Sequence, residues 1–142
     1  NGLRVTDYST YPPNEGASYP VFIPTVDEDG NDIAGIRLPD VSVPLATYMG
    51  WNIGSEGFTK GSLCSVIGSA IPFPLTKSDR QKSADPRLSI EERYVNHEAY
   101  VKQVEEVAKR LMEKRLLLED DVKLYVELAR KRDIGLPSQS YR

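Results

Sequence analysis

Asp32-Ile-Ala-Gly-Ile-Arg-Leu-Pro-Asp-Val-Ser-Val-Pro-Leu-Ala-Thr-Tyr-Met-Gly-Trp51 is the stretch around which the rest of the chain is organised. Two prolines fix φ, two glycines permit positive φ, and the only Trp of the chain closes the segment. Arg37 and Asp40 are embedded among apolar residues, where an uncompensated charge would be costly. We therefore expect each of them to have a partner that anchors this stretch as an ordered loop.

Several motifs of this stretch resemble the C-terminal part of a known family of large bacterial proteins, the alpha/beta-hydrolase domain-containing proteins, which are esterase-like. The motifs are Ile33-Ala-Gly-Ile-Arg-Leu-Pro-Asp-Val41, Val43-Pro-Leu-Ala-Thr-Tyr48 and Gly50-Trp-Asn52. The similarity continues in Ala70-Ile-Pro-Phe73, Thr76-Lys-Ser-Asp-Arg80, Asp85-Pro-Arg-Leu-Ser-Ile-Glu-Glu-Arg-Tyr94 and the tail that follows. The resemblance implies a C-terminal piece of a longer protein, whose hydrolase machinery lies upstream.

Within that setting, four residues of the opening stretch are candidates for lining a substrate pocket. Tyr48 and Trp51 are large and amphipathic, and aromatic loop residues often line clefts. Their structural alternative is to cap the edge of a core. Arg37 and Asp40 either anchor the loop through ion pairs and backbone hydrogen bonds, or one of them faces the active site of the longer protein.

Composition and charge exclude several classes of protein. The chain of 142 residues is 39% hydrophobic and 27% charged, which is typical of a soluble globular domain with a real core. Residues 1–75 hold 3 Lys/Arg against 8 Asp/Glu, whereas residues 76–142 hold 15 against 13, so neither half forms a strongly basic surface for nucleic acid. No apolar run approaches the roughly 18 residues that span a bilayer. A first residue Asn1 fits an excised fragment, and the compartment stays open.

One cysteine and one histidine carry little chemistry by themselves. Cys64 has no second cysteine in the chain, so we expect a buried, small apolar residue; the alternative is pairing with a cysteine outside this chain. A single Cys with a single His is too little for a structural zinc site, and no cofactor motif is present, so we predict neither metal nor cofactor.

The first 75 residues predict extended and irregular structure. Residues 1–20 mix Tyr and Pro with Gly, Ser and Asn without periodicity, which indicates an extended connector or, alternatively, a recognition surface. Residues 21–26 and 32–38 favour two strands joined by the acidic turn 27–31, which does not match an EF-hand loop and is read as a solvated hairpin turn. We expect a long ordered loop from Pro39 to Gly57 and a compact buried connector from Leu63 to Ile71.

The remaining 67 residues predict helices. Thr76 begins a short helix, Ser89-Ile-Glu-Glu92 is a capping box, and Asn96 is a fresh N-cap. Helical spacing predicts two amphipathic helices that form an αα-hairpin. The buried faces are Tyr100, Val104, Val107, Ala108 and Leu111 in the first helix, and Val122, Tyr125, Val126 and Ala129 in the second. Gly135 and Pro137 end the second helix, and residues 138–142 are expected to fray.

The chain lacks the parts of an independent hydrolase. No Gly-x-Ser-x-Gly nucleophile elbow occurs in it, and its one histidine, His97, is expected on a helix surface. A Cys64–His97 nucleophile and base pair has no support from the spacing of the two residues. We therefore predict no catalytic residue in this chain.

The sequence thus predicts an α+β fold in which a hairpin and ordered loop region, residues 1–75, precedes a helical region of three or four helices, residues 76–142, the two forming one domain. The first functional hypothesis is a non-catalytic C-terminal portion of an esterase-like alpha/beta-hydrolase that packs on the upstream hydrolase domain, or self-associates in its absence, and shapes the substrate entrance. The alternative is a self-sufficient protein-interaction module that uses the helical hairpin or the Tyr/Pro-rich arm.

Overall fold

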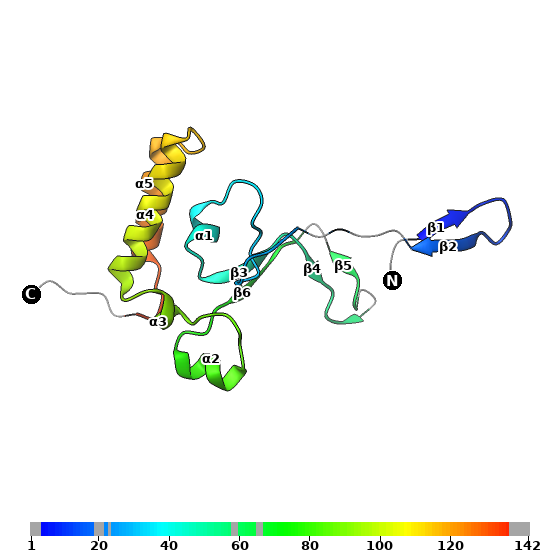
Figure 1. Cartoon of the computed structure of the whole chain (residues 1–142), viewed down its shortest axis with the longest axis horizontal. Coiled ribbons are helices and arrows are strands. Elements are labelled where there is room, and N and C mark those ends of the chain that lie inside the picture. Colours follow the sequence, from blue (N-terminus) through cyan, green and yellow to red (C-terminus); the bar gives the residue numbers. More distant parts are fainter. Residues whose placement is uncertain (1–3, 19–21, 23, 58–59, 65–66, 137–142) are drawn as a thin grey trace, which may run out of the picture.

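A computed structural model of the chain describes residues 4–18, 22, 24–57, 60–64 and 67–136. Within these residues, three two-stranded antiparallel sheets precede a group of helices that ends in a helical hairpin (Figure 1). The predicted α+β class is confirmed. The strands are β1 (Arg4–Asp7), β2 (Asn14–Ser18), β3 (Ala46–Met49), β4 (Asn52–Ile53), β5 (Leu63–Cys64) and β6 (Ser69–Pro72). The helices are α1 (Pro39–Ser42), α2 (Lys77–Ser83), α3 (Ile90–Arg93), α4 (His97–Glu113) and α5 (Glu119–Lys131).

The N-terminal segment, for which the sequence predicts an extended connector or a recognition surface, forms a hairpin in its described residues. β1 and β2 pair in antiparallel register, with Thr6 opposite Glu15 and Asp7 opposite Asn14. Every residue of β1 is exposed, and so are residues 14–17 of β2. Because neither face of the ribbon is buried, the sequence has no apolar and polar alternation from which a strand could have been predicted.

The acidic turn is present, but the two strands expected around it shrink to one bridge between Val26 and Asp32. Gly30 adopts a positive φ of 78°, as predicted for the turn, and a Cβ there would lie 2.9 Å from Cγ2 of Thr47. Beyond the bridge the chain leaves the extended pairing and enters the single turn of α1. Residues 21 and 23 of the first expected strand lie outside the described residues.

The expected loop 39–57 and the expected buried connector 63–71 are both wrong. Pro39 begins α1, where its fixed φ and missing N–H suit the first helical turn. β3 then pairs with β6, Ala46 opposite Pro72 and Met49 opposite Ser69, while β4 pairs with β5. Leu63, Ile67 and Ile71 are 69%, 63% and 46% exposed, so this segment is a strand-forming surface and not a buried connector.

The helix boundaries follow the predicted caps. The side chains of Thr76, Ser89 and Asn96 each accept a hydrogen bond from the backbone amide three residues further on, and Ser89 forms the full capping box with Glu92. α5 ends at Lys131, before Gly135, whose φ is 72°. Pro137 and residues 138–142 lie outside the described residues.

The hydrophobic core lies in the helical region. α4 packs along α5, α1 packs against α4, and the predicted apolar face of α4 is buried as expected. Tyr125 of the predicted α5 face is half-buried, whereas the other three residues of that face are buried. The core cluster comprises Val43, Phe73, Ile90, Tyr94, Tyr100, Val101, Val104, Val107, Leu111, Val126, Ala129 and Ile134. Only Val43 and Phe73 of this cluster come from before residue 76, so the helices supply their own core.

Candidate functional site

One cavity lies between α1, α4 and α5, and we call it the helix groove. It has a volume of about 420 Å³. Its lining residues are Leu38, Pro39, Asp40, Tyr100, Val104, Leu117, Asp121, Leu124, Tyr125, Leu128, Ala129 and Arg132. Buried side chains of the core, Tyr100, Val104 and Ala129, belong to this lining, whereas Leu124 and Leu128 are about half exposed. The cavity is thus an apolar groove with a fixed wall on one side and accessible leucines on the other.

A charged and phenolic cluster marks one end of the groove. Nη1 of Arg132 lies 3.6 Å from Oδ1 of Asp40, and both side chains are 43–44% exposed. This separation exceeds a normal hydrogen bond, and ion pairs so exposed contribute little to stability. Asp40, Tyr100 and Arg132 line the groove together, although they come from α1, α4 and the end of α5. Tyr48 of β3 does not line the groove, but the charges of Asp40 and Arg132 influence the pKa of its phenol.

Tyr48 and Tyr100 are kept protonated. Burial is the largest cause that raises the pKa of both Tyr48 and Tyr100, and the negative charge of Asp40 raises it further. Arg132 opposes this shift in both residues. The net direction is upward, so both phenols remain hydrogen-bond donors at neutral pH.

His97 is occupied by a structural contact at the end of α5. Its Nε2 lies 3.1 Å from the carbonyl oxygen of Ala129 and 3.0 Å from that of Arg132. A ring N–H at this position satisfies carbonyls that the end of a helix leaves without intrahelical partners. The histidine thereby ties the start of α4 to the end of α5 and holds the backbone of Arg132 at the groove.

The acidic turn is locked internally. Oδ1 of Asp27 accepts hydrogen bonds from the amides of Asp29 and Asn31, at 3.0 and 2.9 Å, and Oδ2 lies 2.6 Å from Nη2 of Arg37. Burial would raise the pKa of Asp27, but Arg37 and the two amides outweigh it and lower the pKa. Asn31 is fully buried; its side chain donates to Ala46 O at 3.2 Å and accepts from Tyr48 N at 2.8 Å. The turn is therefore bonded to β3 and is not merely solvated.

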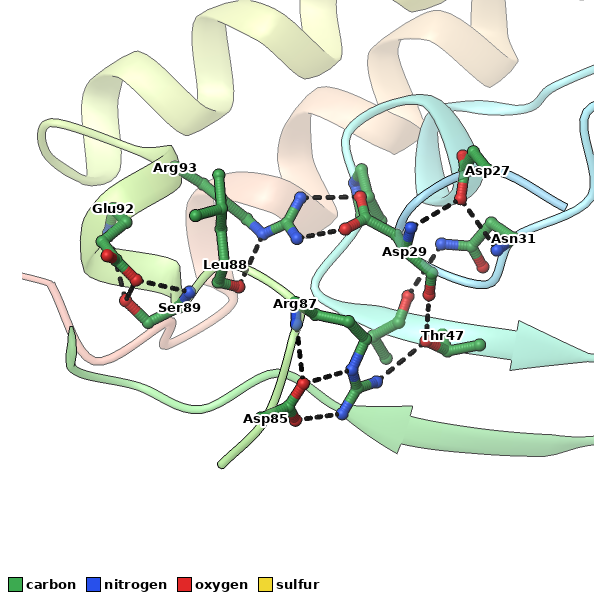
Figure 2. Close-up of polar contacts among 12 residues, drawn as sticks. Asp27, Asp29, Asn31, Thr47, Asp85, Arg87, Leu88, Ser89, Glu92 and Arg93 are labelled. Carbon is green, nitrogen blue, oxygen red and sulfur yellow. Dashed lines mark hydrogen bonds and ion pairs between the residues drawn. The ribbon is translucent and has the colours of Figure 1, made fainter. Parts of the chain in front are cut away.

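A bidentate ion pair joins the turn to the helices. Figure 2 shows the guanidinium of Arg93, from α3, facing both carboxylate oxygens of Asp29. The two side chains are only 13% and 19% exposed. The guanidinium also lies 4.0 Å from the ring centroid of Phe73, a cation–π contact in a largely desolvated position. This arrangement connects the first region of the chain to the core.

Arg87 makes a second connection to the strands. Its guanidinium contacts both carboxylate oxygens of Asp85, at 3.0 and 2.6 Å, and donates to Oγ1 of Thr47 at 2.8 Å (Figure 2). It also donates to Ile71 O at 3.0 Å. Thr47 Oγ1 in turn donates to the backbone oxygen of Asp29. The hydrogen bonds from Arg87 lower the pKa of Asp85 to about 2. One network thus joins the acidic turn, β3, β6 and the segment before α3.

The four residues proposed from sequence as pocket candidates fall in different places. Asp40 lines the helix groove, whereas Tyr48 lies outside its lining, although the charges of Asp40 and Arg132 influence the pKa of its phenol. Arg37 is paired with Asp27 and donates to Val41 O at 3.0 Å, so it anchors the loop. Trp51 is 41% exposed between β3 and β4. Arg37 and Asp40 each have a charged partner, as expected. Arg37 pairs with Asp27 and Asp40 lies beside Arg132, so the two residues do not pair with one another.

Sequence reasoning missed Tyr100, Tyr125 and Arg132 as members of a site. The helical spacing places the two tyrosines on the buried faces of their helices but assigns them no role, and no motif singles out Arg132. A signal was present, because a tyrosine placed on a buried helix face needs a partner for its hydroxyl. Identifying the partner requires knowing how α4 and α5 pack, which spacing alone does not give.

Cys64 is half-buried in β5, whereas a buried position was expected. In the described part of the chain, no three His, Cys, Asp or Glu side chains gather in a group that would hold a metal ion. None of the helices described here combines the length and the apolar character needed to cross a membrane.

Comparison with known proteins gives one match. The sequence model of a family described as alpha/beta hydrolase domain matches residues 6–127, which is most of the chain. No curated protein and no solved structure matches the chain.

Proposed function

The chain belongs to the alpha/beta hydrolase domain family, and we propose that it serves there as a non-catalytic, C-terminal portion that packs on the hydrolase core. The observation that carries this proposal is an exposed apolar ribbon. Ile53 of β4 and Leu63 of β5 are cross-strand partners, and they are 53% and 69% exposed. A two-stranded ribbon is marginally stable alone, so such a ribbon needs a surface to lie on.

Further residues around β4 and β5 have the same character. Trp51, Ile67 and Ile71 are 41%, 63% and 46% exposed. Apolar side chains gathered on neighbouring strands are typical of a surface that another protein surface covers. The arm β1–β2, exposed along its length, would also lie against that partner. Docking at the strands leaves the helix groove accessible and would bring the strand region to the border of the hydrolase core, where it shapes the substrate entrance.

The catalytic part of the proposal is that this chain supplies no nucleophile or base. The sequence has no nucleophile elbow, and the only histidine faces two backbone carbonyls. We expect the isolated chain to hydrolyse p-nitrophenyl butyrate no faster than the double variant Cys64→Ser with His97→Asn. Activity in the chain that either single substitution abolishes would contradict the proposal.

The docking part is tested with a dye that fluoresces on exposed apolar surface. The folded chain, shown to be folded by a cooperative urea transition and diluted until it is monomeric so that its ribbon is not covered by a second copy, should enhance the fluorescence of the dye. Ile53→Ser with Leu63→Ser should lower that enhancement at least about twofold, because the pair dominates the ribbon. The matched control is Leu88→Ser with Val95→Ser, two exposed apolar residues of the helical region. An equal decrease in both double variants would refute docking through the ribbon.

A self-sufficient interaction module is the second candidate. It is favoured by the helical region, which buries a core of its own and carries the helix groove. An autonomous module should be a monomer that unfolds cooperatively, whereas a portion made to dock should self-associate through its ribbon. The oligomeric state therefore separates the two functions.

A further inference from the structure

The helix groove has the composition of a small-ligand site. Leu38, Leu124 and Leu128 are 38%, 53% and 48% exposed at its walls, opposite buried residues of the core. Pockets that bind small molecules are mostly apolar, with a few polar groups that converge at one place. Here the apolar walls run along α5, and the polar groups gather at its C-terminal end. A ligand that fits would have an apolar body and one polar head.

The polar end of the groove combines one guanidinium, that of Arg132, with one carboxylate, that of Asp40. Arg132 presents a guanidinium whose contact with Asp40, at 3.6 Å, is too long for a hydrogen bond. Its planar fork of N–H groups matches the two oxygens of a carboxylate. Tyr100 also lines the groove, and its neutral hydroxyl is a further hydrogen-bond donor. The guanidinium and this hydroxyl are suited to an anionic head.

The two acidic residues of the lining do not make the groove a cation site. Asp121 caps α5, because its Oδ2 accepts a hydrogen bond from the amide of Leu118 at 3.0 Å. Asp40, in α1, lies 3.6 Å from the guanidinium of Arg132, so a ligand carboxylate would have to compete with it for the same positive charge. Asp40 is then an internal competitor for Arg132. A cationic head would instead meet Arg132 at close range and be repelled.

We propose that the helix groove binds a medium-chain aliphatic carboxylate, with its alkyl chain along Leu124 and Leu128 and its carboxylate on Arg132. Asp40 lowers the affinity by competing for the guanidinium. This inference concerns the helical region and does not rest on the docking role of the ribbons, so either can fail without the other.

The test is a titration of the whole chain with sodium octanoate below its micelle concentration, followed by amide chemical shifts or calorimetry. We expect saturable binding, with the largest shifts in α1 and the C-terminal half of α5. Arg132→Gln should weaken binding about tenfold, the effect of losing a charge-assisted pair. Arg130→Gln is the matched control, since Arg130 lies two positions earlier in the chain but does not line the groove. It should leave the affinity unchanged.

Two further comparisons test whether the groove prefers a negatively charged head group: one removes the charge of Asp40, and the other changes the head group of the ligand. Asp40→Asn should strengthen octanoate binding severalfold, and 1-octanol and octylammonium should bind more weakly than octanoate. Circular dichroism of each variant shows that α4 and α5 are intact. The proposal is overturned by absence of octanoate binding, by equal binding of octanol, or by octylammonium binding that Asp40→Asn weakens.

Discussion

The helical region, residues 76–136, buries many of its apolar side chains, whereas the strand region, residues 4–75, leaves most of its described apolar side chains exposed. Among the described residues, twelve of the fifteen buried hydrophobic side chains lie after residue 75. Before residue 43 the one apolar side chain that the described part of the chain buries is Pro39, whereas Tyr8, Tyr11, Phe22, Ile33 and Ile36 are all more than half exposed. The helices therefore stabilise themselves, whereas the strands depend on polar contacts to the helices and on what covers them.

The boundary between the two regions is held by ion pairs. Arg93 and Arg87 reach from the helical side to the acidic turn and to β3 and β6, and both guanidinium groups lie over Phe73. Such contacts fix geometry while burying little apolar surface. The strand region is thus positioned by these directional bonds together with Val43 and Phe73, its two members of the core cluster.

The largest effect should come from removing a core side chain. Leu111→Ala in α4 should lower the free energy of unfolding by about 2–4 kcal/mol, because Leu111 is 9% exposed in the core cluster. The matched substitution Leu63→Ala, on a side chain 69% exposed, should change it by less than about 0.5 kcal/mol. Urea denaturation followed by circular dichroism measures both. If the two variants lost similar free energies of unfolding, the claim that the core lies in the helical region and not in the strands would be wrong.

The next largest effect should come from breaking the connection between them. Arg93→Ala leaves Asp29 partly buried without its bidentate partner and should lower the free energy of unfolding by about 2 kcal/mol. Arg110→Ala, on the exposed side of α4, is the control and should be near neutral. Hydrogen exchange sharpens the test, since amides 29–31 and 46–48 should lose protection in Arg93→Ala while α4 and α5 keep theirs. Uniform loss of protection would mean that the two regions unfold as one unit.

Acid should weaken the same boundary. The pKa of Asp85 is lowered from 3.8 to about 2 in the folded protein by its hydrogen bonds from Arg87. A depressed folded pKa gives stability that is present above the unfolded value and is lost as the pH falls from about 4 to 2. Asp85→Asn should lower the free energy of unfolding by about 1–2 kcal/mol at pH 7. It should also reduce the further loss of stability between about pH 4 and pH 2. Urea midpoints at pH 7, 4 and 3 measure this. An unchanged pH dependence in Asp85→Asn would contradict the assignment.

The helical region could be predicted from sequence because its signals are local. Thr76, Ser89 and Asn96 cap their helices as expected, and apolar spacing identified the buried face of α4. These features depend on residues three or four positions apart, so no tertiary knowledge is required.

The strand region was predicted poorly for a physical reason. β1, β2 and β5 bury neither face completely, so no alternation of apolar and polar residues reveals them. The apolar composition of residues 63–71 predicts burial, but Leu63, Ile67 and Ile71 are exposed, and composition alone does not distinguish a core segment from a surface that a partner covers. The helix groove needed packing information as well, since Asp40, Tyr100 and Arg132 are separated by 60 and 32 residues along the chain.

The central claim is that the ribbon β4–β5 is a docking surface, and its most direct test is the mass of the chain in solution. Size-exclusion chromatography with light scattering should give the unmodified chain a mass well above 15.9 kDa, because exposed ribbons cover one another when no partner is present.

Ile53→Ser with Leu63→Ser should return the mass to 15.9 kDa with stability changed by less than about 0.5 kcal/mol, whereas Leu88→Ser with Val95→Ser should leave the association intact. A monomeric unmodified chain, or dissociation by both double variants alike, would contradict the account.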